Sequence, residues 1–228
     1  MLVLNYYLGY NINNKSYMNK KILLIILGVI LIVLGFKSPM LLIFPMWIFV
    51  YLFLDKFKLL FGKLPLWLSF ISLGVGFGLL TESFAIVENL EVASGDKVLL
   101  SPDPFNDLVL SFFYYLFVIT TLYFLIKKYS YSKIEVFFLV GVYGVFAEEM
   151  GQVFLRIFTV PVFGFIYAIY VVFVYGIFPL LSYMICEDRF ESKKQIGLMS
   201  KFLIGLFAMF LQWAIYGNFV YNSLNTIL

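Results

Sequence analysis

The stretch LPLWLSFISLGVGFGLLTESFAIV, residues 64–87, decides the fold class of this chain. It is long enough to cross the hydrocarbon core of a bilayer, which takes roughly 20 apolar residues. Its only charged side chain is Glu82. Six further apolar segments follow the same pattern, although the first two are shorter, and together they predict an all-α polytopic membrane helical bundle. The predicted transmembrane helices, about seven in number, are residues 22–36, 40–54, 64–87, 107–126, 135–158, 160–185 and 201–223.

The composition agrees with a membrane protein and excludes several kinds of site. Of the 228 residues, 63% are hydrophobic and 13% are charged, whereas a soluble domain is about half apolar and about a quarter charged. The chain has no histidine and a single cysteine, Cys186. These counts exclude a His-ligated metal site, a Ser-His-Asp triad and a disulfide framework. We expect neither a metal nor a cofactor.

The basic residues predict the orientation in the membrane. Lys and Arg concentrate in short cytoplasmic loops. With the N-terminus inside, the cytoplasmic segments hold all but three of the 16 basic residues, the exceptions being Lys37, Lys97 and Arg156. This distribution predicts a cytoplasmic N-terminus, an extracytoplasmic C-terminus and a place in the cell membrane. Because no basic stripe gathers on one soluble face, the net charge of +3 predicts contact with membrane lipids and no nucleic-acid partner.

The chain divides into two parts. Residues 1–21 are predicted to form a cytoplasmic N-terminal segment, and residues 22–228 a single transmembrane domain. The run Met18-Asn19-Lys20-Lys21 before the first apolar segment is typical of a translation start, which would make residues 1–17 an extension. Lys37-Ser38-Pro39 predicts a tight turn between the first two helices.

Charged residues inside the spans indicate where function lies, because each costs about 2.5–3.5 kcal/mol at a helix centre. They are Glu82, Glu148, Glu149 and Arg156. At about 1.5 Å per residue, Glu82 lies about 27 Å along its helix, in the outer half of the membrane. On a continuous helix over 135–158, Glu148 and Arg156 would share one polar side with Gln152 between them.

These residues predict a polar cavity that opens to the outer face, walled by the helices over 64–87, 135–158 and 201–223. The carboxylates and the arginine would form its reactive part. Polar and aromatic side chains of three spans would contact the substrate. The predicted substrate-binding residues are Gln152, Tyr167, Tyr170, Gln212 and Tyr216, with Tyr175 as a further lining residue.

Structural roles compete with this interpretation. Asp103 before Pro104 is typical of a helix start, with Asp as the N-cap. Asp107 would then be a first-turn acid that the helix dipole favours. Arg156 would pair with Glu149 or Glu148, or extend toward the outer headgroups.

Two segments around the glutamates are similar. Gly78-Leu79-Leu80-Thr81-Glu82 and Gly144-Val145-Phe146-Ala147-Glu148 share a glycine four positions before a glutamate. The similarity predicts two helix pairs of the same direction, a parallel repeat. Glu82 and Glu148 would then face each other, and one would keep its proton beside the other carboxylate, as general acid–base chemistry requires.

Short motifs also resemble known membrane enzymes. Ala147-Glu148-Glu149 followed by Arg156 resembles the Glu-Glu-x-x-x-Arg motif of the CAAX-protease and bacteriocin-processing family, which activates water with a Glu and His residues. Val153 stands where that motif has its arginine, and the chain has no histidine, so the resemblance implies a degenerate relative. The same Glu-Glu pair resembles that of the small membrane lycopene cyclases, and Gly78–Glu82 is similar to a segment of membrane carotenoid hydratases. These enzymes protonate isoprenoid chains with carboxylic acids.

Three functions follow from these observations. The first is an enzyme that uses Glu82 and Glu148 in metal-free acid–base chemistry on a lipid or isoprenoid. The second is an ion-coupled transporter of small molecules, because intramembrane glutamates also bind protons and cations. The third is a non-catalytic membrane assembly protein in which the polar cluster specifies helix packing. The sequence leaves the oligomeric state open.

Overall fold

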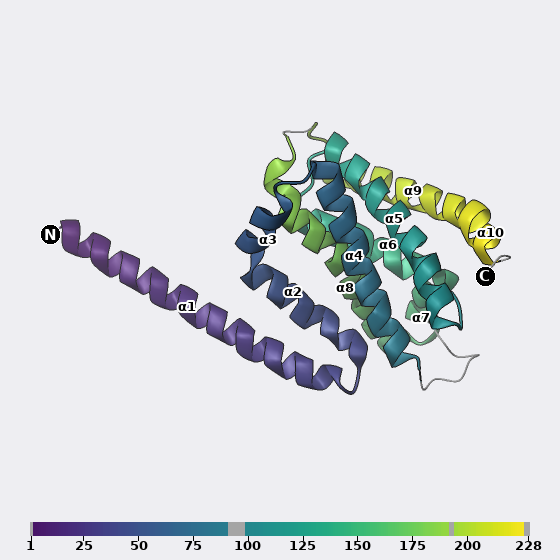
Figure 1. The fold of residues 1–228 in the computed structure, drawn as a ribbon, viewed down its shortest axis with the longest axis horizontal. Helices are drawn as coiled ribbons and strands as arrows, with labels where there is room; N and C mark the ends of the chain where they lie inside the picture. The colour runs from purple at the N-terminus through teal and green to yellow at the C-terminus, as the bar shows by residue number, and fades with distance from the viewer. Residues whose placement is uncertain (1, 91–98, 192–193, 226–228) are drawn as a thin grey trace. The chain divides into compact units, whose positions relative to one another are not determined.

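A computed structural model describes the backbone of residues 2–90, 99–191 and 194–225, and the side chains of residues 19–90, 99–191 and 194–223. In these ranges the chain is helical without a strand, and its one isolated bridge joins Tyr129 to Lys194 (Figure 1). The prediction of an all-α fold is confirmed. Two compact units follow each other, Met1–Phe53 and Leu54–Leu228. The side chains of the predicted extension 1–17, and Lys97 and Lys193 of the loops, lie outside the described residues.

The first unit is a helical hairpin. It consists of α1 (Leu2–Gly35), the 3-10 turn η1 (Pro39–Leu42) and α2 (Ile43–Leu52). The predicted turn around Lys37-Ser38-Pro39 joins its two arms, and Pro39 begins η1. The arms pack against each other at Gly28, where an added Cβ would make an ordinary contact of 3.7 Å with the Ile48 side chain.

The second unit is a helical bundle around α8. Within it α8 packs against α3, α4, α6 and α7, while α5 packs against α4 and α9. Leu110, Ile119 and Leu122 of α5 are fully buried in its core. The elements of this unit are α3 (Leu54–Phe61), α4 (Leu66–Glu88), α5 (Pro104–Lys128), α6 (Lys133–Ala147), η2 (Glu148–Gly151), α7 (Gln152–Thr159), α8 (Pro161–Cys186), η3 (Glu187–Arg189), α9 (Leu198–Ile215), the π-helical turn η4 (Tyr216–Tyr221) and α10 (Asn222–Asn225).

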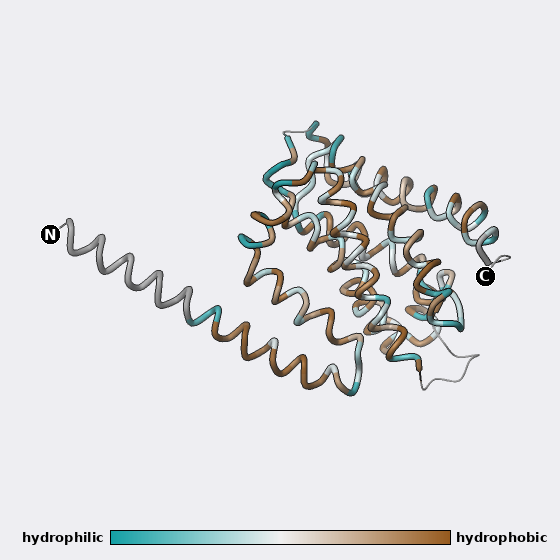
Figure 2. The backbone as a smooth tube through the Cα atoms, viewed as in Figure 1, coloured by the Kyte–Doolittle hydropathy of each residue, from teal (hydrophilic) through white to brown (hydrophobic). Residues whose placement is uncertain are grey.

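Four helices of the described chain are long and apolar enough to cross a membrane: α4, α5, α8 extended through η3, and α9 extended through η4. A fifth is added if α2 and α3 form one bent span. The four match the predicted spans over 64–87, 107–126, 160–185 and 201–223. Hydrophobic residues run along most of the length of these helices (Figure 2), and several of their side chains face outward: Phe124, Phe163 and Phe207 are 62%, 75% and 70% exposed. Lipid is the solvent that fits such a surface, so the fold is that of a helical membrane protein.

The predicted continuous helix over 135–158 is wrong. Helix α6 ends at Ala147 and α7 begins at Gln152, and between them Glu149, Met150 and Gly151 have φ values of 48°, 54° and 88°. Three consecutive residues with left-handed backbone interrupt the right-handed helix, so Glu148 and Arg156 do not share one helix face. The break allows α7 to pack on α8, where Val153 is fully buried in an apolar cluster.

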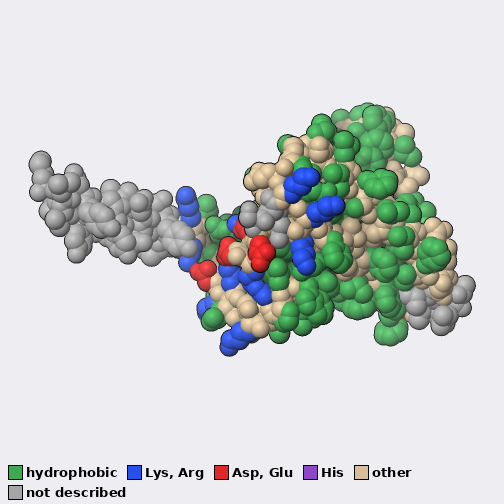
Figure 3. Space-filling model, turned by 90° about the horizontal axis from the view of Figure 1, so that it is seen from above, with side chains coloured by type: hydrophobic (Ala, Val, Ile, Leu, Met, Phe, Trp, Pro, Cys, Tyr) green, Lys and Arg blue, Asp and Glu red, His purple; other side chains and the backbone are tan. Residues whose placement is uncertain are grey.

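Three of the predicted cytoplasmic loops meet at one end of the second unit. The Arg189 guanidinium donates to the carbonyl oxygens of Phe61 (3.2 Å) and Leu64 (2.5 Å), and the Ser130 amide donates to Lys194 O (3.3 Å). Acidic and basic side chains gather on the face drawn in Figure 3. The ion pairs at this end of the unit include Lys58–Asp188, Lys133–Glu187 and Lys201–Glu135. The lysine-rich segments therefore form a common basic end, as the positive-inside pattern requires.

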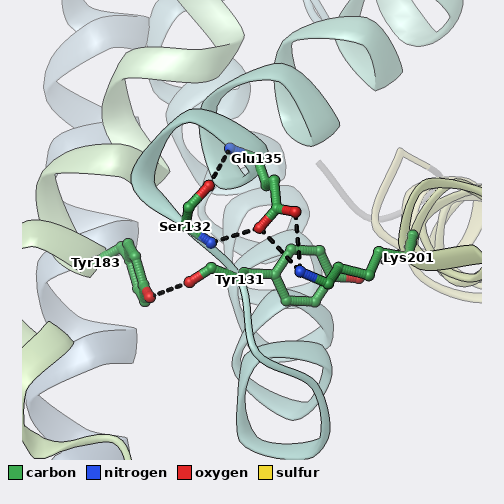
Figure 4. Close-up of polar contacts among 5 residues, drawn as sticks. All are labelled: Tyr131, Ser132, Glu135, Tyr183 and Lys201. Carbon is green, nitrogen blue, oxygen red and sulfur yellow. Dashed lines mark hydrogen bonds and ion pairs between the residues drawn. The ribbon is translucent and has the colours of Figure 1, made fainter. Parts of the chain in front are cut away.

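The ion pair between Lys201 and Glu135 is the best-satisfied part of this basic end (Figure 4). Lys201 Nζ lies 2.9 and 3.1 Å from the two carboxylate oxygens, and Ser132 completes a capping box with Glu135. The Tyr131 hydroxyl donates to Lys201 O at 3.0 Å, and the Tyr183 hydroxyl donates to Tyr131 O at 2.5 Å. Burial beside the Glu135 carboxylate raises the pKa of Tyr131 to about 12, so this hydroxyl remains a donor. These contacts join α6, α8 and α9, which indicates a structural role.

Candidate functional site

Helices α4 and α5 hold Glu82 through a tyrosine. The Tyr115 hydroxyl donates to Glu82 Oε2 at 2.7 Å. One helical turn before Glu82, Gly78 faces the Tyr115 ring so closely that an added Cβ would lie 2.6 Å from its Cγ. The absence of a side chain at Gly78 therefore allows the ring to lie flat against α4 and to reach the carboxyl group.

Glu148 is held in the same way between α6 and α8. The Tyr175 hydroxyl donates a short hydrogen bond to Glu148 Oε2, and the Tyr175 ring lies against the backbone of Gly144. The rings of Tyr115 and Tyr175 both contact Phe178, with centroid distances of 5.0 and 6.5 Å. The two glutamate–tyrosine contacts therefore flank one aromatic side chain of α8.

Glu82 and Glu148 lie on either side of Phe178, through the tyrosines that bind them. Their carboxyl groups lie close enough for their charges to interact, and each charge also acts on the tyrosine that binds the other glutamate. Both side chains are partly exposed. Because each glutamate is close to the C-terminal end of its helix, the pair lies away from the basic end of the unit.

Glu149 and Arg156 form a separate ion pair beside Glu148. Two guanidinium nitrogens lie 2.5 and 2.9 Å from the Glu149 carboxylate, and the Tyr167 hydroxyl donates to the same carboxylate at 3.3 Å. The guanidinium lies 5.7 Å from the Tyr167 ring centroid, and Tyr170 stacks on that ring at 6.2 Å. The structural alternative of an Arg156–Glu149 pair is confirmed. Predicted Gln152 is exposed at the first position of α7.

Gln212 lies on α9, and Tyr216 begins its π-helical end. Gln212 Nε2 donates to Tyr143 Oη at 3.1 Å, and the Tyr143 and Tyr114 hydroxyls are 3.4 Å apart. The Tyr216 hydroxyl donates to Leu110 O at 3.0 Å. Gln212 and Tyr216 are 5% and 3% exposed. Their contacts join α5, α6 and α9, and a substrate contact for either remains a prediction.

One residue of the site, Tyr115, escaped the sequence interpretation, and Asp107 was interpreted mainly as a structural acid. Asp103 caps α5 as predicted, with its carboxylate 2.9 Å from the Asn106 amide. Asp107, interpreted as a first-turn acid, is fully buried, and its side chain lies within hydrogen-bonding reach of Glu82. The signal for Tyr115 is the glycine before Glu82, which shows that a bulky group approaches there but not which residue it is.

The groups that contact Glu82 and Glu148 directly are carboxyl and phenol groups. In the described part of the chain, no group of three or more Asp, Glu or Cys residues could hold a metal ion. No protein family, curated protein or solved structure matches the chain.

Proposed function

We propose that the protein is a membrane enzyme that uses Glu82 and Glu148 as an acid–base pair on a lipid or isoprenoid substrate. One observation carries this proposal: two glutamates of predicted spans are each bound by a tyrosine hydroxyl, and their charges act on each other. A carboxylate within a membrane span is costly, and such a residue is more often functional than structural.

The proposed reaction is a protonation of a carbon–carbon double bond. The acid donates its proton to one carbon, and the resulting cation is discharged in one of two ways. Either the base removes a proton from a neighbouring carbon, which moves the double bond, or the base removes a proton from an attacking water, which gives an alcohol. Each cycle consumes one proton from the acid and returns one to the base, so no oxidant or cofactor is needed.

The remaining predicted residues would shape the entrance. Arg156 and Glu149 neutralise each other next to Glu148, and Tyr167 and Tyr170 add an aromatic wall suited to an apolar chain. In this proposal the substrate enters between lipid-facing helices from the outer leaflet. Gln152, Gln212 and Tyr216 would contact it or the groups around it.

The proposed topology has the basic end in the cytoplasm and the glutamates toward the outer face. It includes about seven spans, with α1 and α2 as a short hairpin and α6 with α7 as one broken span. This arrangement keeps the N-terminus cytoplasmic and the C-terminus extracytoplasmic, and the lysines of the basic end support it. Labelling of single cysteines placed in loops, in a Cys186→Ser background, tests the side on which each loop lies.

The enzyme proposal is tested by comparing lipids from membranes that contain the wild type or the Glu82→Gln, Glu148→Gln double variant. Asp103→Asn is the matched control, because it also exchanges a carboxylate for an amide and Asn caps a helix equally well. Mass spectrometry should detect species that differ by one water or by isomerisation in wild-type and control membranes, and the double variant should lose them. Identical profiles from equal amounts of folded protein would exclude this reaction class.

A proton-coupled transporter is the second candidate, and the helix break favours it. Transporters bind ions and substrates at interrupted helices, and the chain between α6 and α7 is interrupted directly after Glu148. Reconstituted protein should then show pH-dependent uptake in vesicles that the double variant lacks. If neither lipid products nor flux depend on the two glutamates, the assembly role remains.

A further inference from the structure

One carboxylate oxygen of Asp107 has no hydrogen-bond donor within the described chain. Asp107 is fully buried near the start of α5, and its Oδ1 accepts a hydrogen bond from the Ser101 amide at 3.0 Å. Its Oδ2 is buried and accepts no hydrogen bond from any donor in the described chain. A buried oxygen of this kind is unfavourable unless a further group or ion satisfies it.

The Asp107 side chain lies beside the Ser101 and Leu100 backbone and beside another acid, Glu82. The side chains of Asp107 and Glu82 lie within hydrogen-bonding reach of each other. Two ionised carboxylates only accept hydrogen bonds, so they cannot bind each other. A single proton between them turns the contact into a strong hydrogen bond and satisfies Asp107 Oδ2 at the same time.

Among the described residues, which leave out 91–98, no basic side chain acts on the pair in place of that proton. The ionisable groups that act on the pair are Tyr115 of α5, Glu148 after α6, Tyr175 of α8 and Tyr216 of η4. All of these are acids or phenols. Arg156 of α7 is bound to Glu149 within the described chain.

We propose that Glu82 and Asp107 share one proton, and that Asp107 is the positioning residue that keeps Glu82 as the acid of the site. This inference rests on the proposed function and assigns its two roles. Glu82 donates the proton to the substrate, and Glu148, which has a tyrosine donor, acts as the base. After the transfer, repulsion between the two carboxylates drives the return of a proton to the pair.

The contacts of α5 position the carboxyl group of Glu82. Asp107 and Tyr115 are eight residues apart on α5, so they lie on the same side of that helix. Tyr115 binds Glu82 Oε2, which leaves the other oxygen for Asp107 or the substrate. The Ser101 amide holds Asp107 Oδ1. Tyr115 and Asp107 of the same helix therefore both contact the carboxyl group of Glu82.

Infrared spectroscopy of the full chain in lipid vesicles at neutral pH tests the shared proton. All samples carry Glu148→Gln, which removes the other intramembrane partner of Glu82. We expect a carboxylic-acid C=O band, shifted by exchange into D₂O, that both Glu82→Gln and Asp107→Asn abolish and that Asp103→Asn retains. Loss of the band in Asp107→Asn is decisive, because Glu82 is still present there.

A second measurement does not depend on the variants folding. In the wild type, ¹³C labelling of the carboxyl groups of glutamate or of aspartate should shift this band for whichever residue carries the proton. A missing band, or a band that neither label shifts, would overturn the proposal, and stabilisation by sodium in its place would assign a cation to the pair. If the band behaves as expected while lipid products never depend on Glu82 and Glu148, the proton pair stands and the enzyme proposal fails. If lipid products depend on both glutamates but no band exists, the enzyme proposal stands and the shared proton is excluded.

Discussion

The helix pair α4–α5 and the helix pair α6–α8 hold a glutamate by the same local device. In each pair a glycine one turn before the glutamate leaves room for a tyrosine ring from the other helix, and the tyrosine hydroxyl binds the carboxyl group. The residues are Gly78, Glu82 and Tyr115 in the first pair, and Gly144, Glu148 and Tyr175 in the second. The similarity between the two sequence segments thus corresponds to a similarity of contacts.

The surroundings of the two glutamates differ. After Glu82 the helix α4 continues to Glu88, and a second acid, Asp107, reaches the carboxyl group. After Glu148 the helix ends in left-handed backbone, and the neighbouring acid Glu149 is bound to Arg156. Glu82 therefore lies beside an acid, Asp107, that has no ion pair in the described chain, whereas Glu148 lies beside an acid, Glu149, that Arg156 neutralises. Such different surroundings can give two glutamates different roles.

The largest expected effect comes from filling the glycine that the device needs. Gly78→Ala places a Cβ 2.6 Å from the Tyr115 ring, and such overpacking costs about 1–3 kcal/mol of unfolding free energy. Gly144→Ala should cost at least as much, because the Tyr175 ring is closer still. The midpoint of detergent-induced unfolding measures both.

Gly76 provides the matched control on the same helix. A Cβ there meets nothing within 4 Å, so Gly76→Ala should be neutral or stabilise the helix by up to about 1 kcal/mol. Equal effects of Gly76→Ala and Gly78→Ala would mean that tyrosine packing does not define the device.

A smaller effect should separate the two hydrogen bonds. Hydrogen bonds between helices in membranes are worth about 0.6 kcal/mol on average and about 1.7 at most. Tyr175→Phe removes a donor from a glutamate that we propose to be ionised, so its cost should be near the upper value. Tyr115→Phe removes a donor from a glutamate that shares a proton, so its cost should be near the average.

The same unfolding measurement tests this order, with the half-exposed Tyr51 as control, because Tyr51→Phe should change little. A larger cost for Tyr115→Phe than for Tyr175→Phe would reverse the assignment of acid and base.

The comparison also shows which features a sequence can predict. Four spans were predicted to within a few residues, because length and hydropathy suffice for a membrane helix, and the N-cap at Asp103 has a clear residue signature. The basic end follows from the lysine-rich loops. The two glutamates were recognised because a charge within an apolar run is costly in itself.

Features that depend on the partner helix were not predicted. Asp107 has the sequence position of an ordinary first-turn acid, and only the packing of α5 on α4 brings it to Glu82. The break after Glu148 was missed because the residues on both sides keep a helical pattern. Gly151 was its one signal, since Glu149 and Met150 are residue types that rarely adopt positive φ.

The smallest expected effect concerns this break, which distinguishes the second pair from the first. Met150 is 84% exposed with φ of 54°, and a left-handed conformation costs an L-residue about 1–2 kcal/mol. Met150→Gly removes this strain and loses little packing, but glycine has a larger entropy in the unfolded chain, about 0.5–1 kcal/mol. We therefore expect a net stabilisation of about 0.5–1 kcal/mol, measured as a later unfolding midpoint. Gly151→Ala should have the opposite sign, because its φ is 88° while the nearest atom to an added Cβ is 3.6 Å away, so that backbone strain alone is changed. If both substitutions destabilise equally, the turn is held by contacts of Met150 and not by the backbone, and the break would be a packing feature of α7.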